Sequence, residues 1–194
     1  MTIVRMHRRN FVKTAAALAG IAAIPGVSAR AFAAPIAAVI FDERYADARH
    51  FADELVRRGA RPFATRSNVA RLWYDAAGRN IVPDGTRLAG FTPYSDLVVV
   101  QWIVACWNSR VLYEGVHDAR RATTVSHSLT SATGHPQLVA ALSGSSPNWP
   151  RALAAALCCS ELAGARNRRT TIMGKAIRSN DFPGTLVSWT VGQA

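Results

Sequence analysis

The stretch that decides the fold is residues 35–65, PIAAVIFDERYADARHFADELVRRGARPFAT. It opens with an apolar run, residues 35–41, typical of a strand buried on both faces. Residues 42–59 predict a helix that ends at Gly59, because apolar side chains recur there at helical spacing: Tyr45, Ala48, Phe51, Ala52 and Leu55. Residues 60–65 predict a second strand. The chain therefore begins with a strand–helix–strand unit.

Further elements are predicted downstream of this unit. The expected helices are a short one in residues 67–80, one in 93–110 that is apolar nearly all round and buried against the sheet, a short one in 136–144, and one in 146–164. The expected strands end near Thr92, cover 110–118, and close the chain at 185–193. The rest of 119–147 is rich in Ser, Thr and Gly, and 165–184 is basic and irregular.

This order of elements predicts an α/β domain with an open, mainly parallel sheet and helices on both faces, layered as in flavodoxin-like and Rossmann-like proteins. The last strand alternates polar and apolar residues, so we expect it at an edge of the sheet, where an antiparallel direction is one of two alternatives. No internal repeat interrupts the chain. We therefore expect a single domain over residues 34–194.

The first 33 residues have a different character. They contain five arginines and lysines, no acid, and an apolar run over 14–27 that is too short to span a bilayer. Small residues at positions 31 and 33 predict cleavage after Ala33, which leaves Ala34 first. Cleavage after Ala34 is the poorer choice because it puts Phe32 at a small-residue position.

The N-terminal segment contains Arg8-Arg9-Asn10-Phe11-Val12-Lys13. It resembles the twin-arginine translocation signal: paired arginines (Arg8 and Arg9), one free position, Phe11, an aliphatic residue and Lys13. The resemblance implies that residues 1–33 engage the twin-arginine export machinery, and that an already folded protein reaches a bacterial periplasm. The alternatives are a general secretory signal or a retained amphipathic helix.

The net charge limits the classes of partner that this protein can be expected to bind. The chain carries 23 basic and 12 acidic residues, a formal charge of +11. Loss of residues 1–33 removes five bases and no acid, which leaves +6. This basicity suits anionic ligands, an anionic envelope surface or solubility, and we expect neither nucleic-acid binding nor a stable transmembrane span. The cysteines, Cys106, Cys158 and Cys159, are expected to be buried free thiols, although Cys106 could bridge either of the other two.

Polar residues follow three of the predicted strands. Because the carboxyl ends of parallel strands share one edge, we expect a ligand site there. The candidate ligand-binding residues are Asp42, Arg44, Thr92, Ser95, His117 and Asp118. The competing explanation is helix capping, for which Asp42 and Ser95 are suitable residues. We do not expect folding to depend on His117.

The candidates for acid–base catalysis are Asp42, Glu43, His117 and Asp118. A Ser–His–acid set could draw on Ser95, on His117 or His127, and on Asp118, but no GxSxG motif supports it. The first strand is followed by no glycine-rich turn, so a dinucleotide fingerprint is absent. No cofactor is implied by any motif, and no metal site is predicted.

Three functions remain open on the sequence alone. The first is an exported periplasmic protein that binds a small polar or anionic ligand at the carboxyl edge of its sheet. The second is a periplasmic enzyme that uses the edge carboxylates and His117 for acid–base or hydrolytic chemistry. The third is an assembly or accessory partner of another exported protein, anchored by exposed tryptophans such as Trp73 or Trp149.

Overall fold

The strand–helix–strand opening is confirmed. In the computed structural model, β1 (Ile36–Asp42), α1 (Ala46–Arg57) and β2 (Arg61–Thr65) follow one another, and β1 pairs in parallel with β2. Ala38, Val39 and Ile40 are fully buried, as expected of a strand covered on both faces. Gly59 has a φ of 97°, which lets the Ala60 N–H reach back to the Leu55 carbonyl and end the helix.

The structure describes residues 34–66, 68–74, 85–106, 109–119, 124–131, 136–143, 147–160, 168–177 and 184–193. These lie in one compact unit, Phe32–Ala194. The proposed signal, with Arg8, Arg9, Phe11, Lys13 and Ala33, lies outside the described residues. The remaining elements are α2 (Val69–Tyr74), β3 (Arg87–Thr92), α3 (Tyr94–Ala105), β4 (Ser109–Asp118), β5 (Thr124–Ser131), α4 (Pro136–Ser143), α5 (Trp149–Cys159), β6 (Arg168–Ile177) and β7 (Thr185–Gln193).

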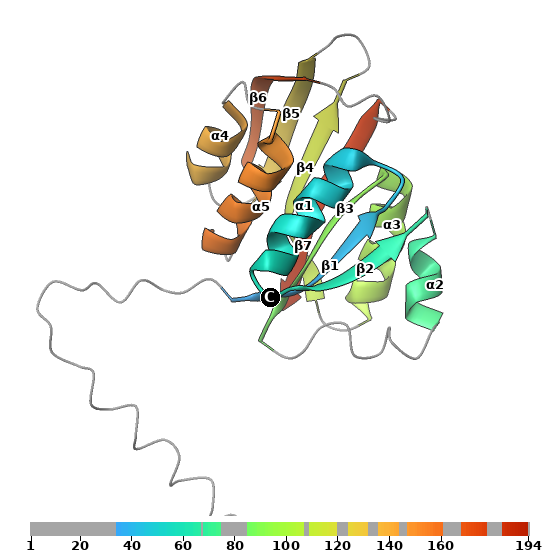
Figure 1. Ribbon diagram of the computed structural model, residues 1–194. Helices are drawn as coiled ribbons and strands as arrows, with labels where there is room; N and C mark the ends of the chain where they lie inside the picture. The colour runs from blue at the N-terminus through green and yellow to red at the C-terminus, as the bar shows by residue number, and fades with distance from the viewer. Residues whose placement is uncertain are drawn as a thin grey trace, which may run out of the picture. The chain divides into compact units, whose positions relative to one another are not determined.

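The seven strands form one mixed sheet in the order β2-β1-β3-β7-β4-β5-β6 (Figure 1). Only β1–β2 and β1–β3 are parallel, whereas β3–β7, β7–β4, β4–β5 and β5–β6 are antiparallel. The α/β class is thus correct, but a mainly parallel, Rossmann-like sheet is not confirmed. One physical reason is that β4 leads directly into β5 without room for the crossover helix that a parallel connection requires.

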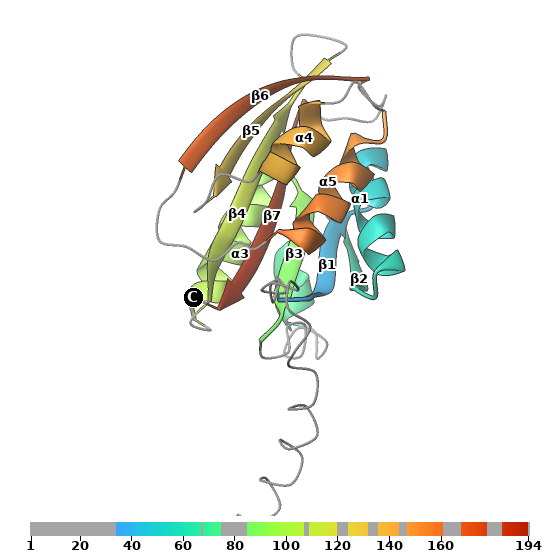
Figure 2. The same cartoon turned by 90° about the vertical axis from the view of Figure 1, so that its left-hand side faces the viewer.

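Helices cover both faces of the sheet, as predicted (Figures 1 and 2). One core lies under α1, α4 and α5 and includes Phe51, Phe91 and Trp149. The other lies under α2 and α3 and includes Leu97 and Trp189. We refer to these as the α1/α5 face and the α2/α3 face.

The last strand, β7, is antiparallel but lies inside the sheet, so its expected edge position is wrong. Leu186 through Gly192 are all buried. The alternation that suggested a solvent face arises because Ser188 and Thr190 point into the protein interior, where both are fully buried. Alternation alone does not distinguish a solvent-exposed face from a buried polar one.

Two strands, β5 and β6, were not predicted. In β5, Val125, His127 and Leu129 are buried and alternate with Ser and Thr, which is a strand pattern hidden in a loop-like composition. In β6, paired with β5, the apolar residues of Arg168–Ile177 stand in adjacent pairs between basic and polar ones and do not alternate, so only pairing with a neighbour identifies it as a strand.

The strand register aligns the predicted site residues. Phe41 of β1 lies level with Phe91 of β3, Phe91 with Ser188 of β7, and Ser188 with Gly115 of β4. Since β4 is antiparallel to β7, it runs in the same direction as β1 and β3. Asp42, Thr92 and His117 therefore lie at the C-terminal ends of their strands, which together form the carboxyl edge of the sheet.

Gly90 is the point at which β3 and β7 pack most closely on the α2/α3 face. A Cβ atom at this position would lie 2.1 Å from the Trp189 ring. We predict that Gly90→Ala lowers the free energy of unfolding by about 2 kcal/mol or more, because the indole must leave its packed position. Urea denaturation measures this. Ala64→Ser, at an exposed position of edge strand β2, is the control, and equal stability of the two variants would contradict the prediction.

Candidate functional site

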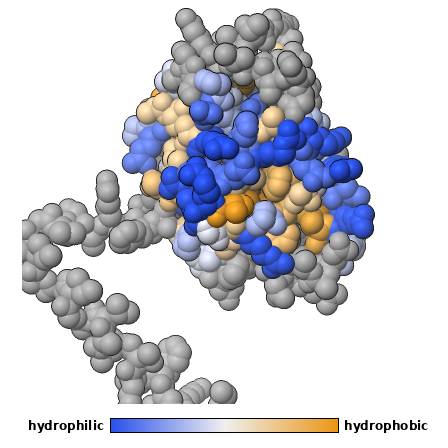
Figure 3. All heavy atoms as spheres, in the orientation of Figure 1, coloured by the Kyte–Doolittle hydropathy of each residue, from blue (hydrophilic) through white to orange (hydrophobic). Residues whose placement is uncertain are grey.

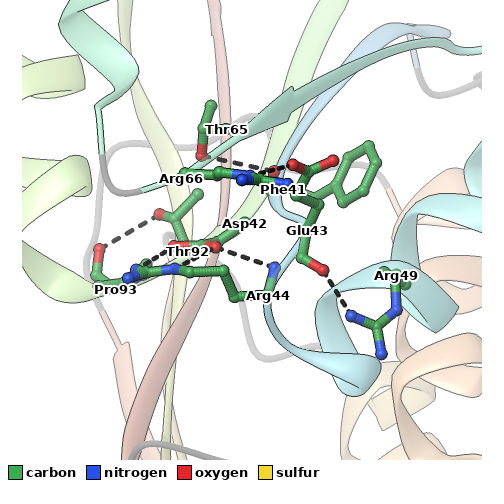
Figure 4. A network of polar contacts seen from close by, with 9 residues as sticks. All are labelled: Phe41, Asp42, Glu43, Arg44, Arg49, Thr65, Arg66, Thr92 and Pro93. Atoms are coloured by element: carbon green, nitrogen blue, oxygen red, sulfur yellow. Dashed lines mark hydrogen bonds and ion pairs between the residues drawn. The ribbon is translucent and has the colours of Figure 1, made fainter. Parts of the chain in front are cut away.

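Asp42 anchors a polar network at the carboxyl edge of the sheet (Figure 4). Its side chain is fully buried, and Arg44 donates to it from Nε at 2.9 Å, from Nη2 at 2.6 Å and from the backbone N–H at 3.1 Å. The Arg44 side chain is 44% exposed. A buried carboxylate thus holds a guanidinium whose outer part remains open to solvent.

Helix capping does not explain these residues. The N-cap position of α1 is Tyr45 and that of α3 is Pro93, and neither helix start has a side-chain capping bond. The Asp42 carboxylate bonds Arg44 instead, and Ser95 is exposed. The capping explanation for Asp42 and Ser95 is therefore wrong.

Asp96, in the first turn of α3, is a site residue that sequence reasoning passed over as an ordinary first-turn acid. It is 4% exposed, and its Oδ2 has no hydrogen-bond partner. Its pKa is raised to about 6, chiefly by burial and then by the charge of Asp42, while Arg44 and a backbone hydrogen bond from Val69 lower it. The site thus contains a second buried carboxyl group, close enough to Asp42 to sense its charge.

The other predicted edge residues divide into two groups. Thr92 is buried, and its Oγ1 accepts a 3.1 Å hydrogen bond from Trp189 Nε1 and donates to the Pro93 carbonyl. It is held by the fold rather than presented to solvent. Glu43 turns outward, where it pairs with Arg66 in an exposed ion pair that contributes little stability.

His117 emerges at the same edge but on the opposite face of the sheet. It stacks on Phe91 with ring centroids 5.3 Å apart and contacts Trp149, both of which belong to the α1/α5 core. Asp42 follows Ala38 and Ile40 on the α2/α3 face. The structure therefore brings Asp42, Arg44, Thr92 and Asp96 together and separates them from His117.

Within the α1/α5 core, His117 belongs to a buried polar chain formed by Tyr113, Ser188, His117 and His127. The Tyr113 hydroxyl lies 3.1 Å from Ser188 Oγ, Ser188 Oγ lies 2.8 Å from His117 Nε2, and His117 Nδ1 lies 2.8 Å from His127 Nδ1. In one arrangement Tyr113 donates to Ser188, Ser188 to His117, and His117 to His127, which gives each of these donors an acceptor. The remaining N–H, on His127 Nε2, has no partner.

This hydrogen-bonded chain is buried from end to end. Ser188 and His117 have the spacing of a nucleophile and its base, but both are fully buried. Burial lowers the pKa of His117 well below its usual value, with a further contribution from His127, and lowers the pKa of His127 to about 4. Both rings are therefore neutral at pH 7. The expectation that folding does not need His117 conflicts with this burial.

The predicted Ser–His–acid set is not assembled. Ser95 lies at the start of α3, on the α2/α3 layer, whereas His117 and His127 lie in the α1/α5 core. Asp118 is half-buried, and its backbone carbonyl accepts a hydrogen bond from Ser126 Oγ. Of the two catalytic candidates on β4, His117 is separated from the Asp42 network by the sheet.

Within the described ranges, no group of three His, Cys, Asp or Glu side chains is arranged to hold a metal ion. No described helix is long and apolar enough to cross a membrane. The three cysteines are free, and Cys106 and Cys159 are exposed, so the expectation of buried thiols is wrong for these two.

No protein-family model matches the chain, and neither a curated protein nor a solved structure is significantly similar to it. The chemistry of the site must therefore be argued from its own residues.

The buried histidines predict a pH dependence of stability. On unfolding, both regain a pKa near 6.5 and take up protons, so stability is complete above pH 6.5 and falls as the pH drops toward about 4. Asp96 acts in the opposite direction, because its raised pKa makes the folded state bind a proton between about pH 6 and 4.

We therefore expect the free energy of unfolding of Asp96→Asn to fall by about 2–3 kcal/mol between pH 6.5 and 5, and that of the wild type to fall less. Urea denaturation at each pH measures it, in a range where ordinary carboxyl groups stay ionised. A flat profile for Asp96→Asn would show that the histidines gain no protons on unfolding.

Proposed function

We propose that this chain is an exported periplasmic α/β protein that binds a small polar ligand at the carboxyl edge of its sheet, on the α2/α3 face. The observation that carries the proposal is the Asp96 carboxyl group, which is buried next to Asp42 with Oδ2 unpartnered. A buried acid with one unpartnered oxygen and a second acid nearby destabilises the fold. Such groups concentrate at functional sites.

The residues assigned to the ligand are Asp42, Arg44, Thr92, Ser95 and Asp96. Asp96 would accept a hydrogen bond from an amine, hydroxyl or amide of the ligand, and Arg44, 44% exposed, favours an anionic group. Asp42 and Thr92 act by holding Arg44 and the start of α3 in place. His117 is no longer assigned to the ligand, because it lies on the α1/α5 face, whereas Asp118 stays a candidate.

The enzyme alternative now rests on Asp96 instead of His117. A carboxyl group with a pKa of about 6 is suited to exchange protons near neutral pH. Its neighbour Asp42, paired with Arg44, provides a second carboxylate in a different environment. Acid–base chemistry on the bound ligand is therefore the second candidate function.

The assembly-partner alternative loses one of its anchors, because Trp149 is fully buried. The expected exposure of Trp149 is wrong, and the Trp73 side chain lies outside the described residues. Trp102, expected to be buried, is 77% exposed instead.

Contacts at the start of the domain support cleavage after Ala33. Arg87 is 3% exposed, and it donates from Nε to the Ala34 carbonyl at 2.6 Å and from the guanidinium to the carbonyls of Leu157 and Ser160. The Arg87 backbone N–H also donates to Pro35 at 2.8 Å. Cleavage after Ala34 would leave a buried guanidinium without one of its acceptors.

The export proposal predicts that replacing Arg8 and Arg9 together by lysine leaves the full-length precursor in the cytoplasm. The reason is that the paired arginines are the defining feature of the signal that this segment resembles. Immunoblots of cytoplasmic and periplasmic fractions measure this, with Arg5→Lys as the control. Mature-sized protein in the periplasm of the double variant would refute the twin-arginine assignment.

The ligand proposal predicts that Asp96→Asn raises the free energy of unfolding at pH 7, on the order of 1–2 kcal/mol, and abolishes ligand binding. Thermal shift with a panel of small amines, alcohols and carboxylates measures both effects. Asp53→Asn, the same change at an acid of α1 whose side chain is 61% exposed, is the control. A compound that stabilises wild type and Asp96→Asn equally would place binding elsewhere.

A further inference from the structure

Helix α3 exposes an apolar stripe to solvent. Tyr94, Val98 and Trp102, which we call the α3 stripe, are 52%, 37% and 77% exposed. They are spaced four residues apart and therefore lie along one side of the helix. The opposite side, with Leu97, Val100 and Val104, is buried in the α2/α3 core.

The neighbouring helix α2, which contacts α3, also has an exposed aromatic residue. Tyr74 of α2 is 88% exposed, and Arg71, three residues earlier, is also exposed. Neither α2 nor α3 exposes an acidic side chain, since the only acid in the two helices is the buried Asp96. Within Val69–Tyr74 and Tyr94–Ala105, the exposed side chains thus include aromatic rings and an arginine and no acid.

The α1/α5 face differs. Figure 3 shows hydrophilic residues spread over much of that side of the molecule, with hydrophobic residues between them. Helix α1 has the usual amphipathic pattern, with charged residues on its outer side. A helix on a sheet needs only one apolar side, so the outer side of α3 calls for a partner of its own.

We infer that the α3 stripe docks the protein on an anionic lipid surface. Tyrosine and tryptophan rings favour the boundary between lipid headgroups and acyl chains. The chain carries a formal charge of +11, or +6 without residues 1–33, which attracts it to anionic lipid. The same charge makes a second copy of the chain the poorer occupant, because two copies repel each other.

The dimensions suit a helix that lies on the membrane. The 12 residues of α3 span about 18 Å, short of the roughly 30 Å hydrocarbon core. The stripe runs along this length, so α3 would lie flat in the headgroup region with its inner side still packed on the sheet. The inference is independent of the ligand site, because Asp96 faces the other side of α3.

The test is co-sedimentation of the full chain with two kinds of vesicles, pure phosphatidylcholine and an equal mixture of phosphatidylcholine and phosphatidylglycerol. We expect binding to the mixed vesicles, and an affinity about ten-fold lower for Val98→Ser combined with Trp102→Ser. Val56→Ser is the matched control, because Val56 is an apolar residue of α1 that is 40% exposed. Residues 1–33 are the same in every variant, so the difference reports on the stripe.

A second readout identifies Trp102 directly. Brominated lipids should quench the tryptophan fluorescence of the bound wild-type chain, and Trp102→Phe should remove most of this quenching while the vesicles still bind protein. Equal binding of the stripe variant and the wild type would overturn the inference. So would a wild-type dimer that becomes monomeric in the stripe variant with vesicle binding unchanged, because a second copy would then cover the stripe.

Discussion

The structure depends on the insertion of β7 between β3 and β4. The sheet has a parallel part, β2-β1-β3, and an antiparallel part, β4-β5-β6, and only β7 joins them through hydrogen bonds. Its side chains fill both cores, with Leu186 and Ser188 on one face and Trp189 on the other. The pairing brings the last strand against elements more than 60 residues earlier in sequence, so the centre of the sheet is held together by long-range contacts.

The two sides of β7 also determine where polar chemistry can occur. On the α1/α5 face, Ser188 meets His117 and Tyr113 in a chain that is sealed from solvent, so its polarity fixes the packing of β4 against β7. On the α2/α3 face, Trp189 fixes Thr92, and through it the turn that leads into α3 and Asp96. The same strand therefore supports a buried polar core on one face and positions the candidate ligand site on the other.

The sequence predicted those parts of the fold in which local signals agree. Residues 35–65 combine a buried apolar run, a helical period and a glycine that ends the helix, and their fold was predicted correctly. His117 was correctly placed at the carboxyl edge with Asp42, but not its face, because strands that are apolar on both sides do not reveal which side the first polar residue takes. Strand β6 was missed because basic side chains obscure its period. Asp96 was missed because an acid in a first helical turn is ordinary, and only tertiary burial distinguishes it.

Helix α3 connects the proposed ligand site with the proposed membrane surface. Successive residues of a helix are about 100° apart, so Asp96 and the stripe residues Tyr94 and Trp102 lie on opposite sides of the same two turns. In the two proposals, the inner side of α3 presents a buried carboxyl group to the ligand and the outer side presents aromatic rings to lipid. Because Leu97, Val100 and Val104 fix the inner side on the sheet, one packed helix can carry both surfaces without a change elsewhere in the fold.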